Sequence, residues 1–236
     1  MANDSYGEIM RPWEFFFFAL SISRDRHLTE GRTLLAHVPR AVSCGSARSG
    51  PRIAALVHLR SQSPTSSWSP PWSVFDCQTT GLDAGLRLIE VAMIDHDGRT
   101  LVDTLVNPRL HISASATALS GIDNAAVRHA PHWGVIWPKL EELLLTQNHI
   151  IAWGAEFDLT AMRSDCARSS DLTWTTAIDA RFVDLASIVS TIVGRECSFE
   201  DACAIASYPA PSVGRQRALA GCRATLQILQ VLGRGT

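Results

Sequence analysis

Between residues 72 and 106 the chain contains three short runs of mainly apolar residues. They occupy residues 72–76, 88–95 and 101–106, and the first ends at a Thr-Thr-Gly turn. Asp97-Gly98, between the second and third runs, is a turn pair typical of a β-hairpin. The pattern predicts three antiparallel strands in succession.

Beyond residue 130 the spacing of apolar side chains changes from that of strands to that of helices. Residues 131–145 carry apolar side chains three and four positions apart, which predicts an amphipathic helix. The same criteria predict strands at 149–153 and 182–185. They also predict helices at 155–167, 184–193, 198–206 and 215–232. Strands first and helix–strand alternation afterwards indicate an α/β fold, a mixed sheet with helices on its faces.

The first 71 residues have a different character. Residues 23–60 are rich in arginine with little periodicity, and residues 61–71 are a Ser- and Pro-rich linker. Residues 1–71 hold 8 Arg against 5 acidic residues, whereas residues 72–236 hold 13 basic against 18 acidic ones. We expect a folded domain at 72–236. The basic arm is either a phosphate-binding segment or a poorly ordered extension, including an over-long start of the reading frame.

The composition is that of an ordinary soluble globular protein. The apolar run at residues 13–22 is shorter than the roughly 20 residues that cross a bilayer, and no small-residue cleavage site follows it closely. The six cysteines form no Cys-x-x-Cys pair. We therefore expect a cytoplasmic protein with reduced thiols and no membrane association.

Six fragments carry a resemblance to a known family. In order along the chain they are residues 74–82, 88–92, 105–108, 116–122, 155–158 and 217–225. Together they resemble the DEDDh-type 3′-to-5′ exonucleases, the family of the proofreading subunit of bacterial DNA polymerase III and of ribonuclease T. The resemblance covers nearly all of residues 72–232 and implies a ribonuclease H-like fold.

In that family, the resemblance implies, four carboxylates hold two Mg²⁺ or Mn²⁺ ions and a histidine deprotonates the attacking water. Two metal ions stabilise the entering and leaving oxygens of a phosphodiester displacement. Hard divalent cations take oxygen ligands, and a base with a pKa near neutrality must lie beside the water.

This chain departs from the family pattern at three of those five positions. Asp76 and Asp158 match the pattern, but Gln78 replaces a glutamate, Gln216 the histidine and Gly221 the last aspartate. General-base catalysis alone contributes typically 10²–10⁴-fold, and a glutamine cannot accept a proton at neutral pH. Two carboxylates leave the charge of two dications uncompensated, so we expect bound Mg²⁺ or Mn²⁺ to be weak or absent. A single ion on Asp76 and Asp158 stays chemically allowed.

Other side chains are weaker candidates for the missing roles. Glu156 is expected to point away from Asp158 on its helix, because two residues correspond to about 200°. Glu90 is expected to have a structural or capping role, with metal binding as the alternative. Asp179 or Asp184 could approach the site, and His149 is expected to be a solvated turn residue rather than a base.

Nucleic-acid contacts are assigned to the turn after the first strand and to one tryptophan. Thr79, Gly81 and Leu82 lie three, five and six residues after Asp76. Trp153 either stacks a nucleobase or packs beneath the following helix. Cys77 alternates with its neighbours along the strand and is expected to be a core residue.

Three functions remain open. The first is a family member that binds single-stranded DNA or RNA 3′ ends but has lost or severely reduced hydrolysis, with a polymerase or a helicase as a possible protein partner. The second is an active metal-dependent 3′-to-5′ exonuclease that uses the reduced site on Asp76 and Asp158. The third is a non-catalytic structural or protein-interaction module.

Overall fold

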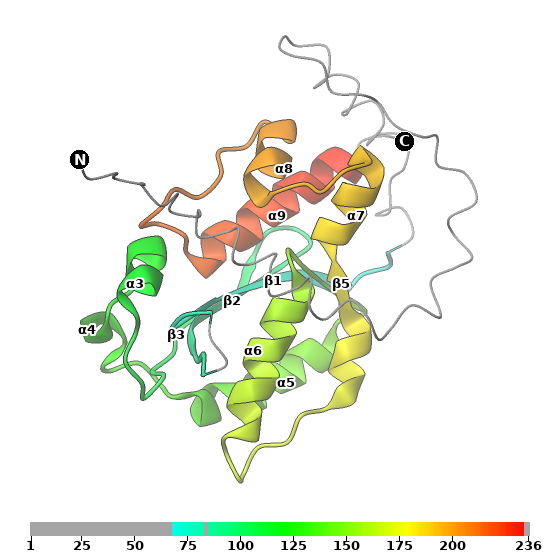
Figure 1. Cartoon of the computed structure of the whole chain (residues 1–236). Helices are drawn as coiled ribbons and strands as arrows, with labels where there is room; N and C mark the ends of the chain where they lie inside the picture. The colour runs from blue at the N-terminus through cyan, green and yellow to red at the C-terminus, as the bar shows by residue number, and fades with distance from the viewer. Residues whose placement is uncertain (1–67, 83–84, 234–236) are drawn as a thin grey trace, which may run out of the picture. The chain divides into compact units, whose positions relative to one another are not determined.

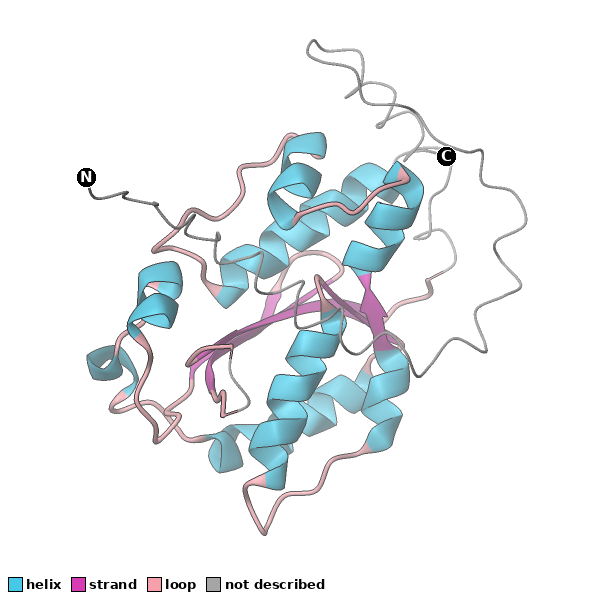
Figure 2. Cartoon of the chain, in the orientation of Figure 1, coloured by secondary structure: helices cyan, strands magenta, loops and turns pink. Residues whose placement is uncertain are grey.

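The computed structural model describes residues 68–82 and 85–233. It contains one mixed sheet of five strands in the order β3-β2-β1-β4-β5 (Figure 2). The strands are β1 (Trp72–Thr79), β2 (Leu88–Asp95), β3 (Thr100–Leu105), β4 (His149–Ala152) and β5 (Phe182–Asp184). β1, β2 and β3 pair antiparallel, whereas β4 pairs parallel with both β1 and β5. This is the mixed sheet that the sequence pattern predicts.

Helices cover both faces of this sheet (Figure 1). One face carries α5 (Trp133–Thr146) and α6 (Ala155–Ala167). The other carries α7 (Leu185–Val193), α8 (Phe199–Ile205) and α9 (Ala218–Gly233). Two short helices, α3 (Ala114–Ser120) and α4 (Asn124–Val127), lie at the β3 end of the sheet, and the 3-10 helix η2 (Thr176–Arg181) precedes β5.

The alternation of side chains along β1 divides the core between these two helical layers. Phe75 and Cys77 belong to the buried cluster that includes residues of α5 and α6. Val74 belongs to the cluster that includes residues of α7, α8 and α9. Because successive strand residues point to opposite faces, Asp76 is directed to the α9 side.

The structure confirms most predicted elements but changes several bounds. β1 runs three residues past the predicted end, because Cys77, Gln78 and Thr79 pair with β2. The last helix begins at Ala218 rather than at residue 215. Sequence periodicity predicted none of α3, α4 and η2, which have seven, four and six residues. Such short helices offer at most two turns of apolar spacing.

The residues just before β1 contact the start of β4. Asn148 donates its backbone N–H to the Pro71 carbonyl at 2.7 Å, and Trp68 contacts the His149 ring with centroids 5.7 Å apart. Residues 1–67, with the basic arm and the apolar run at 13–22, lie outside the described residues, so the division near residue 71 stays a prediction. Among the helices that the structure describes, none has the length and apolar character needed to span a bilayer.

Candidate active site

Asp76 lies near the carboxyl end of β1, against α9. An ideal Cβ placed on Gly221 of that helix would lie 2.2 Å from Oδ2 of Asp76 and 2.9 Å from its Cγ. Burial raises the pKa of Asp76 well above its usual range, and the charges of Asp158 and Glu90 raise it further. Hydrogen bonds from the Cys77 backbone and the Gln78 side chain oppose that rise in pKa. The Asp76 carboxyl group is therefore closely packed against α9 and lies near two other acidic side chains.

Asp158 enters the same region from the other face of the sheet, in the first turn of α6. Gly154, in the left-handed conformation with φ of 78°, precedes this helix, and its N–H donates to Asp184 Oδ1 at 3.0 Å. Asp158 is 1% exposed, and its Oδ1 has no hydrogen-bond partner among the described residues. Burial raises its pKa to about 7, while hydrogen bonds from the Cys77 thiol and backbone lower it and the Asp184 charge raises it.

Of the other four motif positions, three lie beside Asp76: Gln78, Asp158 and Gly221. Gln78 is half-buried and hydrogen-bonds Asp76, and Gly221 contacts the same carboxyl group. Gln216 lies in the segment before α9, where its backbone N–H donates to the Leu119 carbonyl at 3.2 Å. The structure thus brings Asp76, Asp158, Gln78 and Gly221 together and places Gln216 at the entrance to α9.

Glu90 has the capping role that the sequence predicts. Its side chain is 1% exposed; Oε1 accepts from Arg217 Nε at 2.8 Å, and Oε2 accepts from the Ala218 N–H at 2.9 Å. Ala218 is the first residue of α9, so Glu90 satisfies a free N–H at that helix end and also lies near its positive dipole. Glu90 holds α9, which carries Gly221, against β2.

The other acidic candidates have partners elsewhere. Asp184 caps α7 by accepting from the Ala186 N–H at 3.2 Å. Asp179 pairs with Arg163 at 2.9 Å, and Glu156, which is exposed, pairs with the same guanidinium at 3.1 Å. None of these three contacts leads to Asp76, and the predicted divergence of Glu156 from buried Asp158 is confirmed.

Two further sequence features have structural roles. His149 is half-buried at the start of β4, where it pairs with Trp72, at the opposite end of β1 from Asp76. Ser120, in the fragment at residues 116–122, is 2% exposed and donates to the Ala116 carbonyl at 2.8 Å. It also accepts from the Ile122 N–H at 3.1 Å, so its hydroxyl closes the end of α3.

The predicted nucleic-acid contacts differ in their exposure. Leu82 is 47% exposed, whereas Thr79 is buried and donates to the Gly81 carbonyl at 2.7 Å. Trp153 is half-buried and packs on Phe199 of α8, with ring centroids 5.3 Å apart. Leu82 is thus available to a ligand, Thr79 shapes the turn, and base stacking by Trp153 stays a prediction.

The sequence patterns did not identify Asp165 of α6, which binds the residues that close the turn between β1 and β2. Asp165 is 4% exposed; Oδ2 accepts from the Leu88 N–H at 2.8 Å, and Oδ1 pairs with Arg87 at 3.3 Å. The Arg87 carbonyl in turn accepts from the Thr80 N–H at 2.8 Å, and the Arg87 N–H donates to the Thr80 hydroxyl oxygen at 3.0 Å. A signal was present, because Asp165 follows Asp158 by seven residues and so lies on the same helical face.

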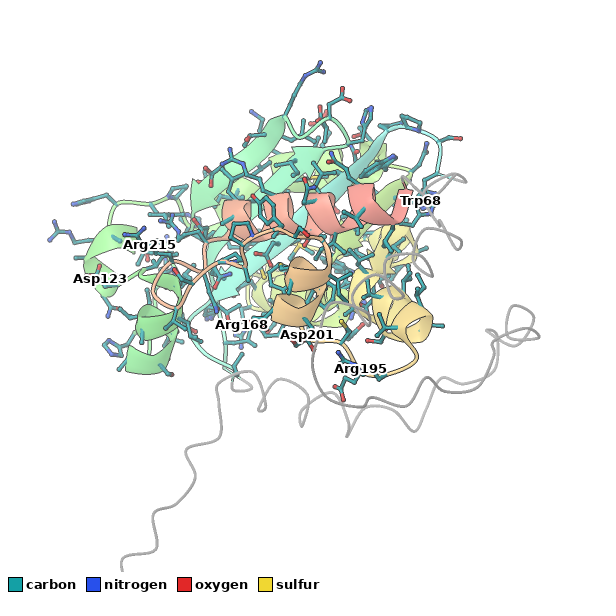
Figure 3. All side chains as sticks on the ribbon, turned by 90° about the horizontal axis from the view of Figure 1, so that it is seen from above. Trp68, Asp123, Arg168, Arg195, Asp201 and Arg215 are labelled. Carbon is teal, nitrogen blue, oxygen red and sulfur yellow. The ribbon has the colours of Figure 1, made fainter. Side chains whose placement is uncertain are left out.

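Exposed charges lie around this region rather than inside it. Figure 3 shows Arg215, in the segment that leads into α9, on the same side of the molecule as Asp123, the N-cap of α4. On another side, Arg195 pairs with Asp201 at 3.2 Å. Arg215 is exposed and directly precedes Gln216, so it is a cation available beside the entrance to α9.

The residues at hand do not fit a two-metal centre. Within the described part of the chain, no three His, Cys, Asp or Glu side chains gather in an arrangement that could hold a metal ion. The Asp158 Oδ1 atom is buried and has no hydrogen-bond partner within residues 68–82 and 85–233, so it is free to be a ligand of a single cation. Oxygen ligands from Asp76 and Asp158 plus substrate phosphates would suit a single Mg²⁺, as the sequence analysis allows.

Comparison with known proteins agrees with this fold. The family model for Exonuclease, RNase_T, matches residues 73–229, more than half of the chain. The protein called Uncharacterized exonuclease CP81, of Escherichia phage 186, is 35% identical over 83 residues, 35% of this chain and 42% of that protein. The PolC-type DNA polymerase III of Caldanaerobacter subterraneus is 35% identical over 95 residues, 39% of this chain and 7% of the polymerase. The aligned parts thus cover less than half of each relative.

Solved structures of low sequence identity share the architecture. A 3′-exonuclease bound to histone mRNA stem-loop has a TM-score of 0.59 at 12% identity, over 70% of this chain and 64% of that one. Exonuclease X with 5′ overhanging duplex DNA has a TM-score of 0.50 at 19% identity, over 68% and 90%. A zinc-bound E. coli exonuclease I with single-stranded DNA has a TM-score of 0.53 at 14% identity, over 67% and 39%.

The fold is therefore that of the ribonuclease H-like exonucleases. The chain belongs to the Exonuclease family of the DEDDh 3′-to-5′ type.

Proposed function

We propose that this domain binds the 3′ ends of single-stranded DNA or RNA and has lost, or severely reduced, phosphodiester hydrolysis. The observation that carries the proposal is the state of the motif positions. Asp76 and Asp158 are the carboxylates present there, Gly221 contributes no side chain, and Glu90 is committed to Arg217 and α9. A site with this donor set and with Gln216 in the place of a base lacks both halves of metal-assisted general-base hydrolysis.

Binding is supported by the family and by the surface beside the site. Members of the family act on nucleic-acid ends, and solved neighbours include complexes with duplex DNA, single-stranded DNA and an mRNA stem-loop. Leu82 and Arg215 are exposed near the carboxyl end of β1 and the entrance to α9. The similarity to a PolC-type polymerase favours a polymerase among the protein partners considered.

The second candidate is residual, metal-dependent exonuclease activity. Oδ1 of buried Asp158, which has no hydrogen-bond partner in the described part of the chain, favours it, because that atom has the character of a ligand for a single Mg²⁺ or Mn²⁺. The ion, when bound, would supply charge neutralisation at the phosphate. Asp76 and Asp158 would hold it, and Gln78 would orient the Asp76 carboxyl.

One assay separates these functions. The full chain is incubated with 3′-labelled single-stranded DNA and RNA in Mg²⁺ or Mn²⁺, and binding of the same oligonucleotides is titrated at several salt concentrations. We expect salt-sensitive binding with intact 3′ ends. Metal-dependent trimming that is lost in Asp76→Ala but kept in Asp171→Ala, an exposed control, would establish the second candidate instead. Absence of binding at low salt would favour a structural or protein-interaction module.

A restored variant tests the assignment of the motif. Gln78→Glu, Gln216→His and Gly221→Asp together rebuild the family pattern, and we expect hydrolysis to rise by at least the roughly 10²–10⁴-fold of general-base catalysis. The three single variants are the controls. If the triple variant folds and stays inactive, the identity of these three side chains alone does not account for the loss of activity.

A further inference from the structure

Gly221 is an unusual residue for its place in α9. It is buried in the first turn of a sixteen-residue helix, where glycine is less favourable than alanine because it loses more backbone freedom on folding. No left-handed backbone conformation requires glycine there, since Gly221 is not among the described glycines with positive φ. The reason for glycine must therefore lie in what surrounds its Cα.

The carboxyl group of Asp76 supplies that reason. A Cβ on Gly221 would lie 2.2 Å from Oδ2, 2.9 Å from Cγ and 3.6 Å from Cβ of Asp76. The first two distances are shorter than any ordinary contact between non-bonded carbon and oxygen or carbon atoms, whereas the third is an ordinary van der Waals contact. The conflict is thus with the carboxyl group alone, not with the backbone of β1.

We infer that Asp76 has turned into the space left by the missing side chain at position 221, so that Asp76 and Gly221 form a sterically coupled pair. Hydrogen bonds from Gln78 and from the Cys77 backbone hold the carboxyl group in this place. Position 221 can accept a side chain only if Asp76 leaves. The site has changed its shape as well as its donor set.

This pairing bears on how the site could regain acidic ligands. An aspartate at 221 would meet the Asp76 carboxyl group sterically and would add negative charge beside Asp158 and Glu90, which already raise the pKa of Asp76. Gly221→Asp by itself is therefore expected to cost stability. The contact between Asp76 and Gly221 belongs to the chain's own packing and is independent of nucleic-acid binding.

A double-mutant cycle tests the pair through stability alone. The full chain and the variants Gly221→Ala, Asp76→Ala and Gly221→Ala with Asp76→Ala are unfolded with urea and followed by tryptophan fluorescence. Gly134→Ala is the matched control: it is also a helical glycine, and its added Cβ would meet the His132 ring at 3.2 and 3.3 Å, a side chain that can move aside.

We expect Gly221→Ala to raise the unfolding equilibrium constant by about ten-fold or more, as overpacking of a core does. Gly134→Ala should leave it unchanged or lower it. With Asp76→Ala in place, Gly221→Ala should raise it by less than about two-fold, because the clashing atoms are gone. An equal cost in both backgrounds, or no cost with Asp76 present, would overturn the inference.

The cycle stays informative if Gly221→Ala yields no folded protein. Recovery of folded protein by the added Asp76→Ala substitution would then support the pair. Failure of the double variant as well would place the conflict in the backbone and overturn the inference.

Discussion

At the residue scale, Asp158 is a carboxyl group whose folded surroundings favour its neutral form. Burial is the largest cause, and it raises the pKa of Asp158 to about 7 from roughly 3.9 in an unfolded chain. A raised folded pKa means that the folded state binds the proton more tightly than the unfolded state. The resulting stability is fully present below about pH 4 and is lost as the pH rises through about 7.

Asp158→Asn should therefore change the pH dependence of stability. We expect wild type to lose up to about 1.4 kcal/mol per pH unit from this group between about pH 4 and 7, and the amide variant to lose less. Relative to wild type, the variant should gain stability from pH 5 to pH 8. Urea unfolding at each pH measures this, with Asp171→Asn as an exposed control. Parallel curves for wild type and Asp158→Asn would contradict the prediction.

Individual motif residues could be found from the sequence, but their contacts could not. Asp76 and Asp158 follow from their place in recognisable fragments, and a structural or capping role was expected for Glu90 without its partner being identified. The approach of Asp76 to Gly221 joins positions 145 residues apart and depends on a side-chain rotation. No pattern along the chain records a rotation.

At the scale of elements, α9 depends on one buried acid. Glu90 accepts from Arg217 and from the Ala218 N–H at the helix start. Glu90→Ala should lower the free energy of unfolding by about 1–3 kcal/mol, the usual cost of leaving hydrogen-bonding groups without partners. Arg217 is 47% exposed, so water replaces part of its interaction. Urea unfolding measures the loss, and Glu142→Ala, on the exposed side of α5, should stay within about 0.5 kcal/mol of wild type.

The turn between β1 and β2 depends on another acid, Asp165 of α6. Asp165 accepts from the Leu88 N–H and pairs with Arg87, whose carbonyl accepts from the Thr80 N–H, so it holds the two sides of the turn together. Asp165→Asn removes the charge that pairs with Arg87, so we expect the turn to loosen and affinity for single-stranded DNA to fall about three- to thirty-fold, equivalent to roughly 0.7–2 kcal/mol.

Two measurements separate this positioning role from general destabilisation. Asp165→Glu should restore part of the affinity, since it returns the negative charge near Arg87. Hydrogen exchange should increase at the Arg87 and Leu88 amides but not in α9. Asp171→Asn, at an exposed position, is the matched control. Uniformly faster exchange across the domain, or unchanged affinity, would contradict the role.

Elements with several residues of regular spacing were predictable, and elements defined by caps were not. The bounds of β2 and α6 agree with the apolar pattern. By contrast, α3 begins where Ser113 accepts from the Ala116 N–H, and α4 where Asp123 accepts from the Ala126 N–H. Serine and aspartate are frequent in turns as well, so their presence alone does not separate a helix start from a loop.

At the scale of the whole molecule, charge is divided along the chain. Residues 1–71 carry 8 Arg against 5 acidic residues, while the remainder is acidic on balance. The acidic groups at the candidate site, Asp76 and Asp158, provide no attraction for phosphate unless a cation is present. An attractive field for nucleic acid would therefore have to come from the arginines of the first 71 residues or from the few at the rim of the domain, such as Arg215.

Two triple variants of the full chain with the same change in net charge distinguish these sources. One carries glutamine in place of Arg48, Arg52 and Arg60 in the basic arm, and the other in place of Arg99, Arg195 and Arg223, which are exposed on the domain.

Because each phosphate contact contributes about 0.7 to the slope of log affinity against log salt for single strands, loss of three contacts in the arm should reduce that slope by about 2. The domain variant should keep the wild-type slope, since Arg99 and Arg195 are paired with acidic neighbours. Fluorescence anisotropy with a labelled single-stranded oligonucleotide across a salt series gives both slopes. Equal reductions of the slope in the two variants would mean that the arm contributes only through its net charge. A reduction confined to the domain variant would place the phosphate-binding surface on residues 72–236.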